Sequence, residues 1–362
     1  MSSSLDKARE TINKIDLEMA RLFEKRMCAA SEIAEYKRER GLPVLDRARE
    51  AELVERNSSY IEDEALRPFY VNFINGLMSV SRSYQSKLLE GARIAYSGTE
   101  GAFAHIAASR LFPTARKIAY PSFEEAYAAV ERGECDSVVL PTENSYNGEV
   151  GRVSDLIFQG SLYVNTVTEL AVTHDLVGTR GATLGKIKQV VSHPQALAQC
   201  REFIELHGLS SVEYENTALA AKYVAERGDP TVAAIASAEA AELFGLSVIE
   251  HNVNASRTNT TRFAVLSRSE CRHTKNEMGV HTILLFTVRN EAGALAKAIE
   301  VIGKHGFNMR ALRSRPMKEL LWQYYFYVEA EGNVNTENGK EMMRELALYC
   351  DRLRAVGTYT KN

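Results

Sequence analysis

The stretch LDKARETINKIDLEMARLFEKRMCAASEIAEYKRER, residues Leu5–Arg40, is one uninterrupted helical pattern. Its apolar residues recur at helical spacing, beginning with Ile12 and Ile15, and Gly41 and Pro43 end the pattern. A helix of this length usually belongs to a bundle or a coiled coil. Two shorter helices are expected from about 46 to 57 and from about 64 to 90. Three helices of unequal length close a core poorly, so we expect this region to dimerise.

Two cations interrupt the apolar stripe of the first helix. Arg26 and Lys37 fall on it, about 20° apart around the axis and about 16 Å apart along it. They are placed to hold opposite ends of one small anion. The alternative is that both stems lie along the core and their charged ends reach solvent.

The other helices also place polar groups on inward faces. Asp46, Arg49 and Glu50 share one face of the second helix, and Ser81 and Gln85 continue the stripe of the third. Unpaired polar groups are costly to bury, so the pattern indicates a polar pocket for an anionic ligand.

Arg9 lies about 25 Å along the first helix from Arg26 and about 100° around it. It cannot reach the pocket of its own chain that holds Lys37. In a dimer it is placed to reach the pocket of the partner.

Residues 5–90 resemble the all-helical chorismate mutases, which are intertwined dimers that convert chorismate to prephenate by a Claisen rearrangement. The resemblance implies that Arg26, and Arg9 of the partner subunit, each hold a substrate carboxylate. It implies that Lys37 and Gln85 donate to the ether oxygen as its bond breaks. It implies that Glu50 binds the ring hydroxyl and that Arg49 orients the acidic groups around it. Asp46 and Ser81 also match in type and spacing.

From Arg93 to Arg268, short β-branched runs alternate with helical stretches, which predicts an α/β region with largely parallel sheets, as one domain or as two lobes around a cleft. Four motifs in this region resemble prephenate dehydratase: Gly98-Thr99-Glu100-Gly101-Ala102-Phe103, Pro141-Thr142-Glu143-Asn144-Ser145, Ser192-His193-Pro194-Gln195 and Asn259-Thr260-Thr261-Arg262-Phe263. The resemblance implies two lobes, like those of periplasmic binding proteins, with the site between them.

The implied reaction expels carbon dioxide and hydroxide from prephenate to give phenylpyruvate. Hydroxide is a poor leaving group, and the resemblance assigns the assisting donor to Thr261 and substrate organisation to Arg262. It assigns further polar contacts to Glu143, Asn144, Ser145 and Gln195. Taken alone, Thr261 also fits an ordinary strand threonine. Ala102 and Ala104 stand where the family commonly has hydroxyls, so two possible donors are missing.

After a polar linker at 268–279, the order strand, helix, strand, strand, helix predicts a small ferredoxin-like domain. It resembles an ACT domain, which implies phenylalanine binding at Gly293, Ala294 and Leu295, and at Ser314 and Arg315. The motif glutamate before Ser314 is replaced by Arg313, which reverses the local charge.

Composition narrows the class of protein. The 362 residues carry a formal net charge of -3, which gives no gross reason to bind nucleic acid. The five cysteines are scattered, no metal-ligand spacing occurs, and no apolar run is long enough to span a membrane. We therefore expect a cytoplasmic homo-oligomer without cofactor or metal.

The combined prediction is a bifunctional enzyme with a mutase domain at 1–91, a dehydratase domain at 92–269 and a regulatory domain at 279–362, inhibited by phenylalanine. One alternative is a non-catalytic amino-acid sensor with a helical dimerisation arm. Another is an enzyme that retains only one of the two activities.

Overall fold

The computed structural model describes residues 4–40, 44, 46–254, 259–271, 279–317 and 324–360. The chain forms two compact units. The first comprises Met1–Arg93 with two short segments, Thr114–Arg116 and Gly133–Asp136, and the second comprises the rest. Most of the expected linker at 268–279 lies outside the described residues.

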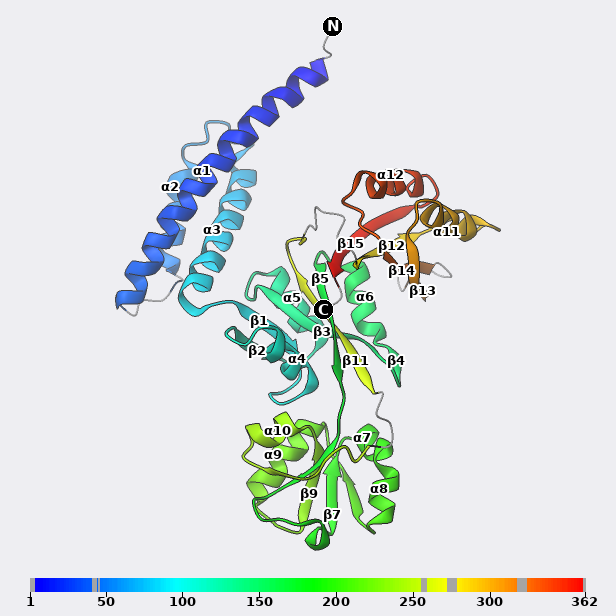
Figure 1. The fold of residues 1–362 in the computed structure, drawn as a ribbon. Helices are drawn as coiled ribbons and strands as arrows, with labels where there is room; N and C mark the ends of the chain where they lie inside the picture. The colour runs from blue at the N-terminus through cyan, green and yellow to red at the C-terminus, as the bar shows by residue number, and fades with distance from the viewer. Residues whose placement is uncertain are drawn as a thin grey trace. The chain divides into compact units, whose positions relative to one another are not determined.

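The first unit contains three helices, α1 (Ser4–Arg40), α2 (Arg47–Ser58) and α3 (Arg67–Glu90), drawn blue to cyan in Figure 1. Asp46 caps α2 by accepting a hydrogen bond from the backbone N–H of Arg49 at 3.0 Å. Pro68 lies in the first turn of α3, where its missing N–H costs nothing. The expected helices are confirmed, and α3 begins a few residues later than expected.

Much of the apolar stripe of α1 is exposed. Ile12, Ile15 and Leu22 are 56%, 51% and 61% accessible. Phe69 and Phe73 on α3 are also exposed. The described helices of one chain therefore leave large apolar side chains of α1 and α3 uncovered.

The second unit contains two α/β lobes. The sheet of the first lobe has the order β2-β1-β3-β11-β5, with the short β4 (Gly148–Glu149) paired to β3. Its other strands and its helices are β1 (Arg93–Ser97), β2 (Arg116–Tyr120), β3 (Ser137–Asn144), β5 (Tyr163–Ala171), β11 (Thr260–Ser267), α4 (Phe103–Leu111), α5 (Phe123–Glu131) and α6 (Gly151–Gln159).

The second lobe has a sheet of order β10-β6-β9-β7-β8. Its elements are β6 (Asp175–Gly178), a 3₁₀ turn (Leu184–Lys186), β7 (Gln189–Ser192), α7 (Pro194–Gln199), α8 (Arg201–Leu206), β8 (Ser210–Glu213), α9 (Thr217–Arg227), β9 (Val232–Ala236), α10 (Ala238–Leu243) and β10 (Ser247–Glu250). Helices α9 and α10 cover one face of this sheet and α7 and α8 the other (Figure 1), with a separate apolar core under each pair.

The prediction of largely parallel sheets is wrong. Strand β11 runs antiparallel to both β3 and β5, and β6 runs antiparallel to β9 and β10. The reason is connectivity, because β11 returns from the second lobe to the first and enters the sheet from the opposite end. This return places the start of β11 beside the end of β3.

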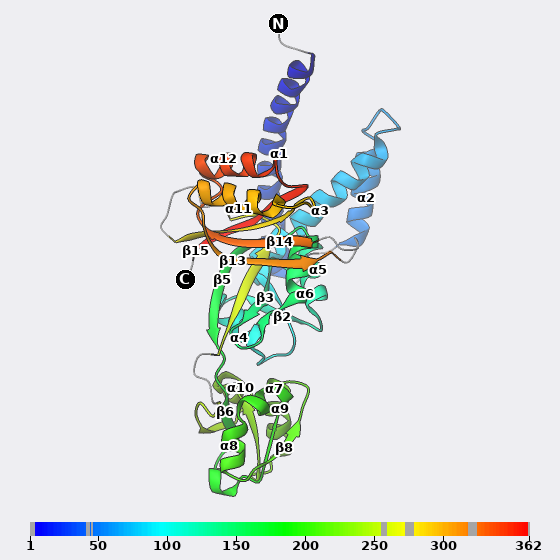
Figure 2. The same ribbon diagram turned by 90° about the vertical axis from the view of Figure 1, so that its right-hand side faces the viewer.

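The C-terminal region is a βαββαβ unit with the sheet order β13-β14-β12-β15. Its elements are β12 (Val280–Thr287), α11 (Ala294–Lys304), β13 (Asn308–Pro316), β14 (Tyr324–Glu331), α12 (Glu337–Leu346) and β15 (Arg352–Thr360). Both helices pack on one face of the sheet (Figure 2). The sequence prediction omitted β15, whose pairing with β12 only the tertiary structure supplies.

Within the described residues, no helix has the length and apolar character needed to cross a membrane.

Candidate functional site

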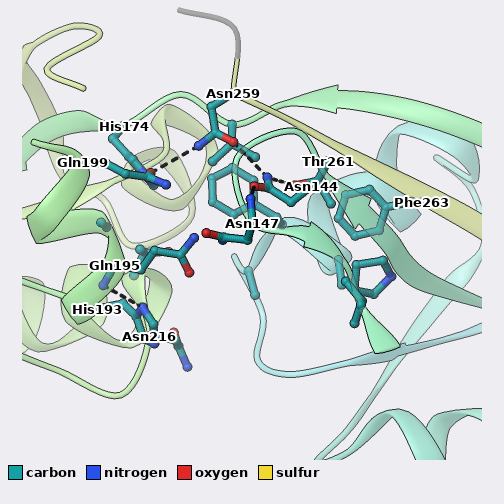
Figure 3. A pocket seen from close by; sticks show the side chains of 18 of the residues that line it. Asn144, Asn147, His174, His193, Gln195, Gln199, Asn216, Asn259, Thr261 and Phe263 are labelled. Atoms are coloured by element: carbon teal, nitrogen blue, oxygen red, sulfur yellow. Dashed lines mark hydrogen bonds between the residues drawn. The ribbon is translucent and has the colours of Figure 1, made fainter. Parts of the chain in front are cut away.

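A cavity of about 340 Å³ lies between the two lobes of the second unit (Figure 3). One side comes from the first lobe, with Asn144, Thr261 and Phe263, and the other from the second lobe, with Gln195 and Gln199. None of the described residues that line it is Asp, Glu, Lys or Arg. The cavity therefore offers amide and hydroxyl groups, and not fixed charge, to a ligand.

Asn144 and Thr261 line this cavity side by side. They are paired in the register of β3 with β11, and Nδ2 of Asn144 lies 2.9 Å from Oγ1 of Thr261. The amide donates, so the threonine oxygen accepts and its own proton stays available for a ligand. Oδ1 of Asn144 accepts from the backbone N–H groups of Tyr146 and Asn147, at 3.0 Å each, which fixes the amide orientation.

A chain of hydrogen bonds continues into the second lobe. Asn144 Nδ2 also lies 2.8 Å from Oδ1 of Asn259, Asn259 Nδ2 donates to Gln199 Oε1 at 3.2 Å, and His174 Nε2 lies 2.9 Å from the same Gln199 oxygen. Burial lowers the pKa of His174, which keeps the ring neutral at physiological pH. Its buried Nδ1 has no hydrogen-bond partner among the described residues.

Sequence reasoning missed His174 and Gln199. Gln199 follows Gln195 by four residues, so both fall on the same face of one helix, and this spacing was an available signal. His174 had no such signal, because only the connection between β5 and β6 brings it to the cavity. His193 lines the cavity and also caps α7, accepting from the backbone N–H of Gln195.

The structure does not bring every expected residue to the cavity. Ser145 Oγ accepts from the backbone N–H of Thr260 at 2.9 Å. Arg262 and Glu143 point away from the cavity and bind residues of the C-terminal region. Ala102 and Ala104 line the cavity, so the missing hydroxyls leave apolar surface there.

The first unit gathers a second polar cluster. Arg26 of α1 donates to the Ser81 hydroxyl of α3, and Lys37 Nζ donates to the Val44 carbonyl at 2.5 Å. Burial lowers the pKa of Arg26. Gln85 is 8% exposed, and its Oε1 has no hydrogen-bond partner among the described residues.

Of the second-helix residues, Glu50 is half-buried and binds a residue of α3. Its oxygens lie 2.6 and 2.5 Å from Nη1 of Arg82, a residue that sequence reasoning missed because it lies off the stripe. Arg49 is exposed and pairs with Glu52 at 2.8 Å, while Asp46 serves as the helix cap. Arg9 is exposed on α1.

A second cavity, of about 350 Å³, lies in the C-terminal region beside the start of α11 and is lined by Leu295 and Phe326 among others. Gly293 precedes α11 with φ of 83°, a conformation that favours glycine, and Ala294 opens the helix. Ser314 is exposed. Arg315 binds Asp155 of α6 at 3.0 Å instead of lining this cavity.

Among the residues that the structure describes, no group of three or more His, Cys, Asp or Glu side chains is placed to hold a metal ion.

Two family profiles match the chain, chorismate mutase type II over residues 8–86 and prephenate dehydratase over residues 94–271. The bifunctional chorismate mutase/prephenate dehydratase of Neisseria gonorrhoeae is 31% identical over 99% of this chain and 99% of that protein. Among solved structures, GqqA, described as a novel type of quorum quenching acylase, is 32% identical with a TM-score of 0.69, covering 75% of this chain and 98% of its own. The prephenate dehydratase of Arthrobacter aurescens in complex with L-Phe is 26% identical with a TM-score of 0.67, covering 74% of this chain and 89% of its own.

Proposed function

Because the chain belongs to the family of bifunctional chorismate mutase/prephenate dehydratases, it carries both of these activities of phenylalanine biosynthesis, and we propose which of its side chains perform each one. The mutase domain is 1–91, the dehydratase domain 92–269 and the regulatory, ACT-type domain 279–362.

Chorismate binds in the polar cluster of the helical unit. Arg26 holds one carboxylate, while Lys37 and Gln85 stabilise negative charge that grows on the ether oxygen. A pericyclic rearrangement requires no nucleophile and no proton transfer, so a site that orients the substrate and stabilises charge is sufficient. The burial of Gln85 supports this role, because it holds a side-chain amide in the cluster whose Nε2 can donate to the ether oxygen.

The mutase works as a homodimer in which Arg9 of the partner subunit completes the site. The uncovered apolar face of α1 supports this arrangement, because a second chain would bury it. Asp46 and Arg49 act at the edge of the site, and Ser81 and Glu50 hold polar groups of the substrate.

Prephenate binds in the cavity between the lobes, where Asn144 and Thr261 form what we call the catalytic pair. The ring carboxylate leaves as carbon dioxide, and the electron pair of that bond completes the aromatic ring as the hydroxyl group takes up a proton and leaves as water. The hydroxyl of Thr261 hydrogen-bonds the leaving group, since Asn144 already donates to its oxygen.

The other residues of the cavity form a polar side for the carboxylate that remains and an apolar side for the carboxylate that is lost. Gln195 belongs to its polar side, where side-chain amides donate hydrogen bonds to the remaining carboxylate, while Ser145 lies outside the cavity and supports the start of β11 through its bond with Thr260. Phe103, Phe123 and Phe263 line its apolar side. An apolar environment penalises a carboxylate and favours its loss as neutral carbon dioxide.

Phenylalanine binds in the C-terminal region at Gly293, Ala294 and Leu295 and inhibits the dehydratase. The cavity beside α11 supports this assignment, because backbone N–H groups at a helix N-terminus donate hydrogen bonds to a carboxylate. Ser314 belongs to the same site, while the contact of Arg315 with Asp155 argues for a role between the domains. The five free cysteines agree with a reducing, cytoplasmic location.

The test supplies chorismate alone to the purified chain and follows chorismate, prephenate and phenylpyruvate together by liquid chromatography. Formation of phenylpyruvate above the uncatalysed rate is expected. Accumulation of prephenate alone would show that the dehydratase is inactive, and no loss of chorismate would contradict both activities.

A further inference from the structure

Arg262 directly follows Thr261 on β11, and its side chain lies on the opposite face of the sheet from the cavity, because successive strand residues alternate. Both of its terminal nitrogens bind the carboxylate of Glu329 on β14, Nη1 to Oε2 at 3.1 Å and Nη2 to Oε1 at 2.9 Å. Nη2 also donates to Oη of Tyr359 on β15 at 3.1 Å. Two strands of the C-terminal sheet therefore hold this arginine in a fixed orientation.

Glu329 is 2% exposed. Burial alone would raise its pKa, but the hydrogen bonds from Arg262 and Tyr359 and the charge of Arg262 hold the pKa of Glu329 below its ordinary value. The carboxylate is therefore charged at neutral pH. Replacing it with an amide would remove the nearest carboxylate from the guanidinium of Arg262 and leave only the longer ion pairs with Glu143 at 3.6 Å and Glu169 at 3.9 Å.

A second ion pair repeats the arrangement on the neighbouring strand. Glu143 stands opposite Arg262 in the β3–β11 register, just as Asn144 stands opposite Thr261. Its Oε2 accepts from Nη2 of Arg313 on β13 at 2.7 Å. Asn144 directly follows Glu143 in the chain, and Thr261 directly precedes Arg262. The C-terminal sheet binds the side chains of both of these neighbours.

We propose that Glu329 and Arg313 are positioning residues for the dehydratase reaction. By binding the chain neighbours of the catalytic pair on the far face of the sheet, they set where that pair points in the cavity. The arginine at 313, which replaces the motif glutamate, is explained by its negative partner Glu143 on β3. This inference rests on the proposed dehydratase site, and it places Arg262 outside direct substrate contact.

The experiment compares Glu329→Gln and Arg313→Gln with Arg310→Gln in the full chain. Arg310 is the matched control, because it lies on the same strand as Arg313 and binds Glu331 within the C-terminal sheet, at 2.7 Å from Nε. Misplacing reacting groups slightly is costly, so dehydratase kcat should fall roughly ten- to a hundredfold in both test variants, with a smaller change in KM. Mutase activity in the same preparations, and both activities of Arg310→Gln, should stay at the wild-type level.

A double variant separates positioning from general stability. If Glu329 acts through Arg262, then Arg262→Gln combined with Glu329→Gln loses no more kcat than the worse single variant. Additive losses would overturn the proposal, as would unchanged dehydratase kcat in the folded variants. If Glu329→Gln does not fold, the dehydratase kcat of Arg313→Gln provides the test, because Arg313 is partly exposed. Full dehydratase activity of Thr261→Ala would instead show that the proposed site itself is wrong.

Discussion

Nδ2 of Asn144 lies 2.9 Å from Oγ1 of Thr261, across the antiparallel pairing of β3 with β11. The segment between the two strands contains β4, α6 and β5 of the first lobe and then the whole of the second lobe. The pair therefore exists only once the chain has returned from that lobe. Its geometry leaves the threonine proton free to act in the dehydration step that we propose.

Removing the hydroxyl proton of Thr261 should reduce the dehydratase activity and leave the mutase activity unchanged. Thr261→Val keeps the shape of the side chain but eliminates the donor, and dehydratase kcat should fall by roughly 10²-fold or more. Steady-state assays with prephenate measure the loss, and chorismate assays measure the mutase. Thr166→Val on β5 of the same sheet is the control and should keep both activities. Equal loss of both activities in folded Thr261→Val would contradict separate sites.

Lys37 should be needed for the mutase alone. Lys37→Ala removes a donor to the ether oxygen, so mutase kcat should fall roughly 10²- to 10³-fold while prephenate is still dehydrated normally. Lys14→Ala, which removes a largely exposed cation of the same helix, should change neither activity. Retention of mutase activity by Lys37→Ala would show that the cation only packs along α1.

Arg9 should act on the site of the other chain. Arg9→Ala and Lys37→Ala are each expected to lack mutase activity. Refolding them together forms hybrid dimers in which one of the two sites holds both Lys37 and Arg9, so activity should return to roughly a quarter of the wild-type level. A mixture as inactive as its components would contradict a shared site.

The phenylalanine response should depend on Gly293. Alanine is strained at its positive φ, and the change lies at the helix N-terminus beside the cavity, so Gly293→Ala should weaken binding of phenylalanine. Gly306→Ala carries a similar strain at φ of 78° in the same region and serves as the control. Calorimetric titration and inhibition of the dehydratase give the two measurements. Equal affinity in both variants would place the ligand elsewhere.

His174 should make stability depend on pH. Burial lowers the pKa of His174 below the ordinary value of 6.5. As the pH falls, the ring is therefore protonated in the unfolded chain before it is protonated in the folded chain. The contribution of neutral His174 to the free energy of unfolding is complete above pH 6.5 and declines as the pH falls below 6.5. Between about pH 7.5 and about pH 5.5, Tm should fall more for the wild type than for His174→Gln. Equal falls would mean that the ring is protonated freely in the folded protein.

The sequence predicted some features well because they depend on local spacing. Arg26 and Ser81 were each assigned to an inward stripe by helical periodicity alone, and the structure joins them by a hydrogen bond. Asn144 and Thr261 were assigned from short motifs, and both line the cavity. The prediction of largely parallel sheets failed at β11, because strand patterns carry no information on whether a neighbour runs parallel or antiparallel.

By itself, the amino-acid order determined which residues share a helix face and which follow one another along a strand, because both depend only on the backbone period. It therefore established the stripe of α1 and the alternation of Thr261 with Arg262. Only the tertiary structure decided what each face meets. Thr261 faces the cavity and Arg262 meets Glu329, since these contacts join residues that are distant in the chain and become neighbours only when lobes and sheets pack.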